Sequence, residues 1–252
     1  MFIDTHLHLS KYDYENIDSV IERAKNANVE RLIVSACERE NMVEVLSFVD
    51  RYDQVYYSFG FHPSCVNEIK DDDLVWLEET IAKNPKIVAI GEIGLDYHYG
   101  KENKVEQREL FIKQLHLAEK LNLPVVIHSR DATEDTINIL KQFKLKGVIH
   151  CFSGSLETAN IYIDMGYLLG IGGVVTFSNS NLFSVVQKIS LDKIVLETDS
   201  PYLSPVPLRG KVNESKNLPY IANKIAEIKQ IDIETVGKIT TENAVSLFDL
   251  TK

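Results

Sequence analysis

Two histidines stand one residue apart near the start of the chain, in "MFIDTHLHL". Successive strand residues alternate between faces, so a strand here places Ile3 and Thr5 on one face. Asp4, His6 and His8 are then expected together on the other face. Imidazole nitrogens are common metal ligands, and two of them on one face can converge on one ion. A lone His-x-His is more often a pair of hydrogen-bonded histidines at a strand end, so the rest of the chain has to decide between the two interpretations.

Alternating apolar and amphipathic stretches predict the elements that position these side chains. The predicted strands are 1–5, 31–36, 55–61, 86–92, 123–128, 146–150, 167–173 and 193–198, and the predicted helices are 16–28, 40–52, 73–84, 104–122, 133–143, 156–166, 181–190 and 218–230, with one or two more in 231–250. Strands and helices that alternate in this way predict a parallel sheet covered by helices. Eight such units fit an α/β fold, a (β/α)8 TIM barrel, as one domain over 1–252. A doubly wound sheet is the alternative, but "GIGG" at 170–173 lacks the spacing of a dinucleotide-binding turn.

Ionisable side chains fall at the carboxyl ends of the predicted strands. Besides the first pair, they are His62, Glu92, His128, His150 and Asp199. In a TIM barrel all of these ends meet at the catalytic face. Without His62 the set holds four histidines and two carboxylates, which is more than one zinc needs. Two adjacent divalent ions that share a carboxylate would use the whole set, and Glu92 is well placed to bridge them. His116 falls within a predicted helix and is interpreted as an ordinary helix residue.

Composition limits the class of protein. With 252 residues, 44% of them hydrophobic, the chain can bury a full core. Its apolar runs are too short for a membrane span, and polar residues interrupt the first segment where a signal peptide needs an apolar region, so we expect a soluble cytoplasmic protein with no membrane partner. Three cysteines without a C-x-x-C spacing predict neither disulfides nor a thiolate zinc site. No exposed apolar stripe is evident, so we expect a monomer without an obligate protein partner.

The net charge of −10 argues against broad nonspecific adhesion to nucleic acid, which needs a basic face. A polyanionic substrate would have to be held locally, by metal ions or by a few arginines.

Six segments resemble, in order, the signature segments of the TatD family of metal-dependent deoxyribonucleases, within the amidohydrolase-like barrels. They are "FIDTHLHL", "SFGFHPS", "AIGEIGLDYH", "PVVIHSRDA", "IHCFSGS" and "LETDSPYLSPVPLRGKVNES", and they span residues 1 to about 214. The resemblance implies that His6, His8 and Asp199 bind one metal, that His128 and His150 bind the other, and that Glu92 bridges both. Imidazoles suit Zn²⁺, whereas Mg²⁺ and Mn²⁺ prefer oxygen, so zinc, manganese and magnesium are all candidates.

This reading predicts hydrolysis of DNA phosphodiester bonds by a metal-bridging water, with exonuclease action on single-stranded ends. Glu92 is expected to hold the metals. Asp199 is the candidate proton acceptor, and the alternative is that it serves only as a ligand. His62 is needed for neither ligand set, so it is free to contact the scissile phosphate or protonate the leaving oxygen. The alternative for His62 is a loop histidine stabilised by its neighbours.

Further residues at the same strand ends are candidates for substrate binding. Arg130 and Arg209 can grip phosphate in bidentate geometry, although a rim salt bridge or a solvated side chain is the alternative. The backbone amides of Ser153 and Gly154 precede a predicted helix and can hold a phosphate at its N-terminus, or the segment is a simple helix cap.

Four residues near the predicted ligands have less specific readings. Glu197 and Asp96 can orient a ligand from behind, or form structural ion pairs. Tyr97 and Tyr202 can stack on bases, although core packing is the more common use of an aromatic ring.

Two other functions fit the same site. The first is an amide, lactone, ester or aminoacyl-ester hydrolase, but the bridging ligand in such barrels is often a carboxylated lysine, and the residues around Glu92 offer none. The second is a non-enzymatic protein with structural metals, although structural zinc sites close four ligands around one ion and favour cysteine.

Overall fold

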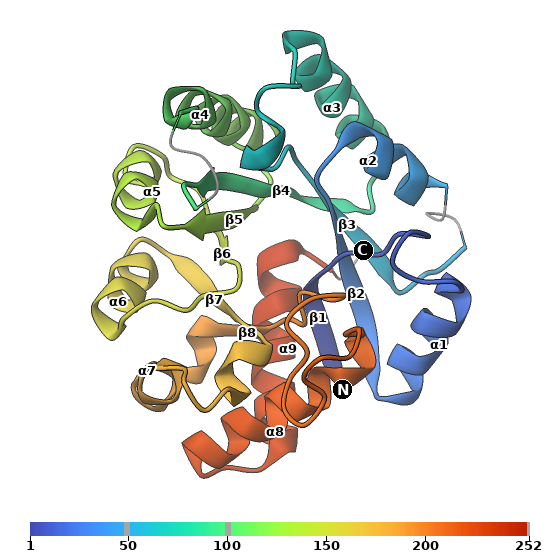
Figure 1. Ribbon diagram of the computed structural model, residues 1–252, viewed down its shortest axis with the longest axis vertical. Helices are drawn as coiled ribbons and strands as arrows, with labels where there is room; N and C mark the ends of the chain where they lie inside the picture. The colour runs from blue at the N-terminus through green and yellow to red at the C-terminus, as the bar shows by residue number, and fades with distance from the viewer. Residues whose placement is uncertain (48–50, 99–101, 251–252) are drawn as a thin grey trace.

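Eight parallel strands form one sheet in the order β1 to β8 in the computed structural model, which describes residues 1–47, 51–98 and 102–250. The helices surround this sheet on its outside (Figure 1). The strands are β1 (Phe2–Leu7), β2 (Val29–Ala36), β3 (Val55–Phe59), β4 (Ile87–Asp96), β5 (Val125–Arg130), β6 (Gly147–Ile149), β7 (Tyr167–Ile171) and β8 (Ile194–Leu196). Each predicted strand overlaps one of these, so the predicted TIM barrel is confirmed.

Each predicted helix also overlaps a helix of the structure. The helices are α1 (Ile17–Asn26), α2 (Arg39–Leu46), α3 (Asp71–Lys83), α4 (Lys104–Leu121), α5 (Thr133–Leu140), α6 (Leu156–Asp164), α7 (Leu182–Lys188), α8 (Leu218–Lys229) and α9 (Ile233–Phe248), with short 3-10 turns η1 (Pro63–Cys65), η2 (Gly173–Thr176), η3 (Leu191–Lys193) and η4 (Ser215–Asn217). Part of the predicted helix 40–52 lies outside the described residues. Segment 231–250 forms the single helix α9. Within the described residues no helix is both long and apolar enough to cross a membrane.

Side-chain caps fix where several helices begin. Asn16 accepts a hydrogen bond from the Ser19 amide at the start of α1, and Asp232 accepts one from Thr235 at the start of α9. Ser155 caps α6 in the same way. Backbone amides in the first turn of a helix have no acceptor within the helix, and each cap side chain accepts from one of them. The polar cap residue therefore fixes where the preceding loop ends and the helix begins.

The first and last strands meet along the remaining edge of the sheet. Leu7 pairs with Ser200 in a parallel bridge, and the Thr5 hydroxyl donates to the carbonyl of Leu196 over 3.0 Å. The amide of Asp199 donates to the carbonyl of His6 over 3.0 Å. These contacts bring the two ends of the sheet together as a nearly closed barrel.

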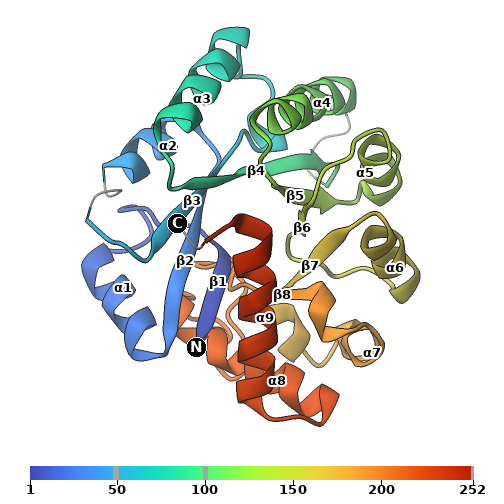
Figure 2. The ribbon, with the colours of Figure 1, turned by 180° about the vertical axis from the view of Figure 1, so that it is seen from behind.

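An apolar cluster fills the barrel and continues into α9. Strand residues such as Ile3, Ile33 and Val126 pack there with Phe248 and Leu250 from the end of the chain. Helix α9 crosses the face of the barrel that is seen from behind in Figure 2. The chain therefore closes one end of its barrel with its own last helix, at the end opposite the carboxyl ends of the strands.

A shift in register within β1 contradicts one prediction about its faces. Asp4 pairs with Leu32 and Leu7 pairs with Val34, so β1 contains one residue more than β2 over this interval. The extra residue breaks the simple alternation of faces, as a β-bulge does. Asp4 therefore does not face the site with His6; its carboxylate accepts hydrogen bonds from the hydroxyls of Thr198 and Ser215, in a fully buried position.

Candidate metal centre

The six predicted ligands come from five different strands and meet at one end of the barrel. His6, Glu92 and His128 lie within β1, β4 and β5, whereas His8, His150 and Asp199 stand just beyond β1, β6 and β8. Because all strands are parallel, these positions share the barrel end opposite α9. The structure thus brings together every residue that the sequence assigned to the metal site.

Glu92 directs its two carboxylate oxygens at two different groups of histidines. Its Oε2 lies 3.5 Å from His6 Nε2 and 3.7 Å from His8 Nε2. Its Oε1 lies 2.8 Å from His128 Nδ1 and 3.8 Å from His150 Nε2. A carboxylate in this orientation can offer one oxygen to each of two adjacent cations.

Asp199 links the same two groups of histidines through one oxygen. Its Oδ1 lies 3.6 Å from His8 Nε2 and 3.7 Å from both His6 Nε2 and His150 Nε2. The residue holds a positive φ of 53°, which turns the chain sharply where β8 ends. The sharp turn lets a residue just past the strand direct its side chain across the barrel end.

The buried ring of His6 shows that these side chains suit a cation. Only 1% of His6 is exposed, and neither ring nitrogen has a hydrogen-bond partner in the described part of the chain. Its separations from the Glu92 and Asp199 oxygens exceed the 2.7–3.2 Å typical of such a hydrogen bond. Two ligands that each lie about 2.0–2.2 Å from one tetrahedral ion are about 3.3–3.6 Å apart; the 3.5 Å separation from Glu92 falls in this range, and the 3.7 Å separation from Asp199 lies just above it. A buried polar nitrogen without a partner is costly, and a metal ion would satisfy it.

Both carboxylates are held in the charged form that binds a cation. Burial alone would raise the pKa of Glu92, but contacts with His128 and His6 hold that pKa well below its usual range. Burial likewise opposes ionisation of Asp199, and the charge of His150 together with the contact to His8 lowers its pKa. For His150 itself, burial would lower the pKa, but the charges of Glu197 and Asp199 raise it to about 9.

A second layer of acidic groups supports the histidines from behind. Asp96 Oδ2 lies 3.0 Å from His128 Nε2, and Glu197 Oε1 lies 3.1 Å from His150 Nδ1. Glu197 is fully buried and also accepts a hydrogen bond from the amide of Cys151. Of the two readings left open for these carboxylates, the contacts favour orientation of metal ligands.

The sequence reasoning missed Cys37, one of the three cysteines for which it predicted neither a disulfide nor a thiolate zinc site. Its Sγ lies 3.5 Å from Glu92 Oε2, so the thiol contacts the candidate bridging carboxylate. Cys37 directly follows β2, and the rule that collected the other site residues, polar groups at the carboxyl ends of strands, would also have found it.

Gly94 sets how closely β4 approaches β5 beside the site. It pairs with His128 in the sheet register and has a φ of +147°. A Cβ at this position would lie 1.9 Å from the His128 carbonyl oxygen, which no side chain can tolerate. Only glycine lets the strand that carries Glu92 pair closely with the strand that carries His128.

His62 also reaches the centre, with its Nε2 3.7 Å from Glu92 Oε1. The amide of Ser64 donates to His62 Nδ1 over 3.1 Å, so in the neutral ring the proton is on Nε2 and faces the site. Burial lowers the pKa of His62 to about 4, so the ring is neutral at pH 7. A neutral ring in this tautomer is a hydrogen-bond donor, which favours phosphate contact over protonation of a leaving oxygen.

The predicted phosphate-binding residues lie at or just beyond strand ends at the same end of the barrel, and their roles stay predictions. Arg130 ends β5 and is exposed, while Ser153 and Gly154 precede α6. Arg209 has structural contacts: its guanidinium lies 4.1 Å from the ring centroid of Phe177 and donates to the carbonyl of Ser204.

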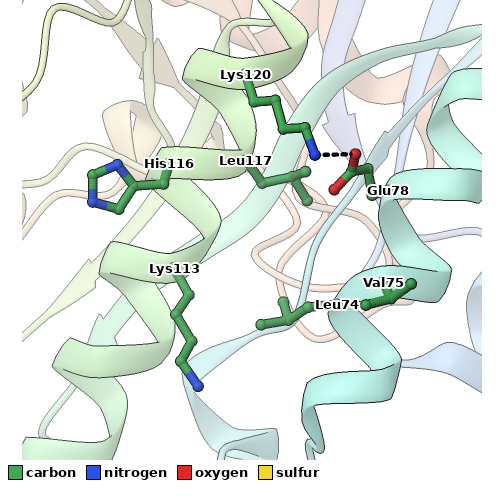
Figure 3. Close-up of a pocket in the computed structure, with 7 residues that line it drawn as sticks. All are labelled: Leu74, Val75, Glu78, Lys113, His116, Leu117 and Lys120. Atoms are coloured by element: carbon green, nitrogen blue, oxygen red, sulfur yellow. Dashed lines mark ion pairs between the residues drawn. The ribbon is translucent and has the colours of Figure 1, made fainter.

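Side chains of α3 and α4 line a groove that includes none of the candidate metal ligands (Figure 3). It encloses about 210 Å³. Leu74, Leu117 and His116 line it, and Lys120 pairs with Glu78 across it. His116 is a solvent-exposed residue of α4, as predicted, and the groove holds no cluster of metal-ligand type among the described residues.

Comparisons with known proteins agree with the geometry of the site. The family model described as TatD related DNase matches residues 3–249. The chain is 43% identical to YabD of Bacillus subtilis, named as an uncharacterized metal-dependent hydrolase, over 98% of this chain and 99% of that protein. Its fold is similar to the crystal structure of YjjV, a TatD homologue of Escherichia coli, with a TM-score of 0.91, 31% identity and 98% coverage of both chains. A TatD family hydrolase from Entamoeba histolytica is similar at a TM-score of 0.89 and 25% identity, with 99% of this chain and 98% of that one covered.

Proposed function

We propose that this chain, which belongs to the TatD-related DNase family, is a metal-dependent hydrolase that cleaves phosphodiester bonds of DNA. The orientation of Glu92 carries the proposal, because its two oxygens face separate pairs of histidines. That orientation suits two divalent ions, one held by His6 and His8 and the other by His128 and His150. Zinc, manganese and magnesium remain the candidate ions.

Two bound ions would supply Lewis acidity to water and to a phosphate oxygen. The protein's own groups would perform the remaining steps. Asp199, ionised at neutral pH, would accept the proton of the attacking water. The neutral ring of His62 would donate its Nε2 proton as a hydrogen bond to a phosphate oxygen. Arg130, Arg209 and the amides of Ser153 and Gly154 are the proposed contacts for phosphates further along the strand.

Differences in exposure among the side chains of the centre support one direction of approach for a substrate. The side chains of His6, Glu92 and His150 are 1–6% exposed, whereas those of His8, His62 and His128 are 17–22% exposed. A substrate would meet the second group first. We propose that single-stranded ends are the substrate, because a free end can bring one phosphate down to these side chains more easily than an intact duplex.

Cleavage of end-labelled single-stranded DNA would test the proposal. Protein stripped with a chelator would receive Mg²⁺, Mn²⁺ or Zn²⁺ separately, beside the variant Glu92→Gln and the control variant Glu79→Gln. Glu79 is an exposed glutamate of α3 that pairs with Lys83. We expect a metal-dependent ladder from one end in wild type and in the control, and a loss of at least about 100-fold in the Glu92 variant. Full activity of Glu92→Gln would refute the mechanism, and absence of cleavage with every metal would refute the choice of DNA.

A further inference from the structure

Two tyrosines near the site have opposite surroundings. Tyr97 is 4% exposed and its hydroxyl donates to Asp135 over 2.7 Å, so it is part of the core. Tyr202 is 59% exposed, and its ring centroid lies 6.0 Å from that of His8. An exposed aromatic ring therefore stands beside a proposed metal ligand.

The backbone that carries Tyr202 is tied firmly to the end of β8. The Tyr202 amide donates to the carbonyl of Asp199 over 2.8 Å, and its carbonyl accepts from Asn213 Nδ2 over 2.7 Å. The same Asn213 nitrogen donates to the carbonyl of Thr198 over 2.9 Å. Asn213 is fully buried, and the hydroxyl of Tyr14 in turn donates to its carbonyl. A buried network thus positions a residue whose own side chain remains in solvent.

We infer that the ring of Tyr202 is a stacking platform for a nucleobase of the nucleotide whose phosphate reaches the metal centre. This inference rests on the proposed function. A ring beside His8 lies within reach of the base that belongs to that nucleotide. Tyrosine has few rotatable bonds, so a ring on a fixed backbone loses little conformational entropy when a base stacks on it.

Stacking also suits the charge of this protein. With a net charge of −10, the chain as a whole repels a polyanion, so binding must come from local contacts. A base that stacks on an aromatic ring contributes affinity without charge. Every base has a π-face, so this contact tolerates any sequence, and we expect little sequence preference at the stacked position.

A double-mutant cycle that combines changes at Tyr202 with removal of the substrate base would test the stacking. The protein would be wild type, Tyr202→Ala, Tyr202→Phe and the control Tyr220→Ala, each loaded with metal. Tyr220 lies on α8 and is 45% exposed. The substrates would be two single-stranded oligonucleotides that differ only at the terminal nucleotide, which either has its base or has hydrogen in place of it. Metal content would be measured for each variant, because Tyr202 neighbours His8.

Loss of the ring and loss of the base should have the same effect. We expect Tyr202→Ala to lower kcat/KM on the normal substrate by about 5- to 100-fold. Removal of the base should lower kcat/KM of wild type to a similar extent, and Tyr202→Ala should lose nothing further on the base-less substrate. Tyr202→Phe retains the ring and should therefore restore the activity that Tyr202→Ala loses, whereas the control Tyr220→Ala should match wild type in activity and metal content.

Three results would overturn the inference. An equal loss on both substrates in Tyr202→Ala would show that the residue acts through His8 and the metals. Unchanged kcat/KM on the normal substrate would show that the ring contacts no base. If wild type cleaves neither oligonucleotide, the proposed function itself fails and the inference falls with it. If wild type cleaves DNA but the effect of Tyr202→Ala does not depend on the terminal base, only the stacking inference fails and the nuclease proposal stands.

Discussion

The neutral state of His62 predicts a measurable dependence of stability on pH. Burial lowers the pKa of this ring from about 6.5 to about 4. Between these values the unfolded chain binds a proton at His62 that the folded protein does not bind, so folding loses free energy as the pH falls. The stability from the neutral ring is fully present above pH 6.5, and the loss reaches about 3 kcal/mol once the pH is below 4.

The variant His62→Asn isolates this contribution. An asparagine oxygen can still accept the hydrogen bond that the Ser64 amide gives to His62 Nδ1, but the side chain does not titrate. Between pH 7.5 and pH 5.0, wild type should lose about 2 kcal/mol more unfolding free energy than the variant. The assay is urea unfolding of metal-free protein at both values of pH, with His116→Asn on the surface of α4 as the control.

Equal pH dependence in wild type and His62→Asn would refute the reasoning. It would mean that His62 titrates in the folded protein as it does in the unfolded chain. The ring could then be charged at mildly acidic pH, and a role as proton donor to the leaving oxygen would regain its place beside the role as a neutral donor to phosphate.

Other changes should separate metal binding from stability. Glu197→Gln removes the charge behind His150 and should weaken metal binding by about 10- to 100-fold with the fold intact, measured by competition with a chromogenic chelator. Gly94→Ala forces a Cβ against the His128 carbonyl and should cost about 1–3 kcal/mol in urea unfolding and reduce bound metal; unchanged values would show that the strands can separate without cost. Phe248→Ala should cost about 3–5 kcal/mol without changing metal stoichiometry, since Phe248 packs at the opposite end of the barrel. Free metal at 100 times its Kd should stabilise wild type by about 2.7 kcal/mol per site over chelated protein, and no change in the midpoint would exclude a site present only in the folded state.

The sequence predicted the fold and the convergence of the candidate metal ligands because both depend on regular patterns. Parallel strands bring their carboxyl ends together whatever the details of packing, so polar residues at those ends had to meet. The positions of Glu92, His128 and Asp199 at the ends of predicted strands were enough to predict that these side chains lie close together. Such contacts can be predicted without knowing the conformations of individual side chains.

Other features depend on local geometry that no pattern shows. The register shift in β1 turned Asp4 away from His6, and an alternating pattern cannot indicate where one extra residue is inserted. Arg209 folds onto Phe177, a contact between two loops distant in sequence. The sequence also left Tyr97 and Tyr202 equivalent, because exposure of a loop aromatic depends on which neighbours cover it.

The packing of helix α9 against the barrel has a consequence for substrate binding and product release. Apolar side chains fill the barrel, and Phe248 and Leu250 extend this packing at the end opposite the candidate metal centre, so the described residues leave the centre open on one side only. A nucleic-acid strand cannot pass through the filled barrel. Substrate must therefore reach the centre, and product must leave it, from the same side. A product that has not yet left occupies the space that the next substrate needs. Product should therefore compete directly with substrate for entry.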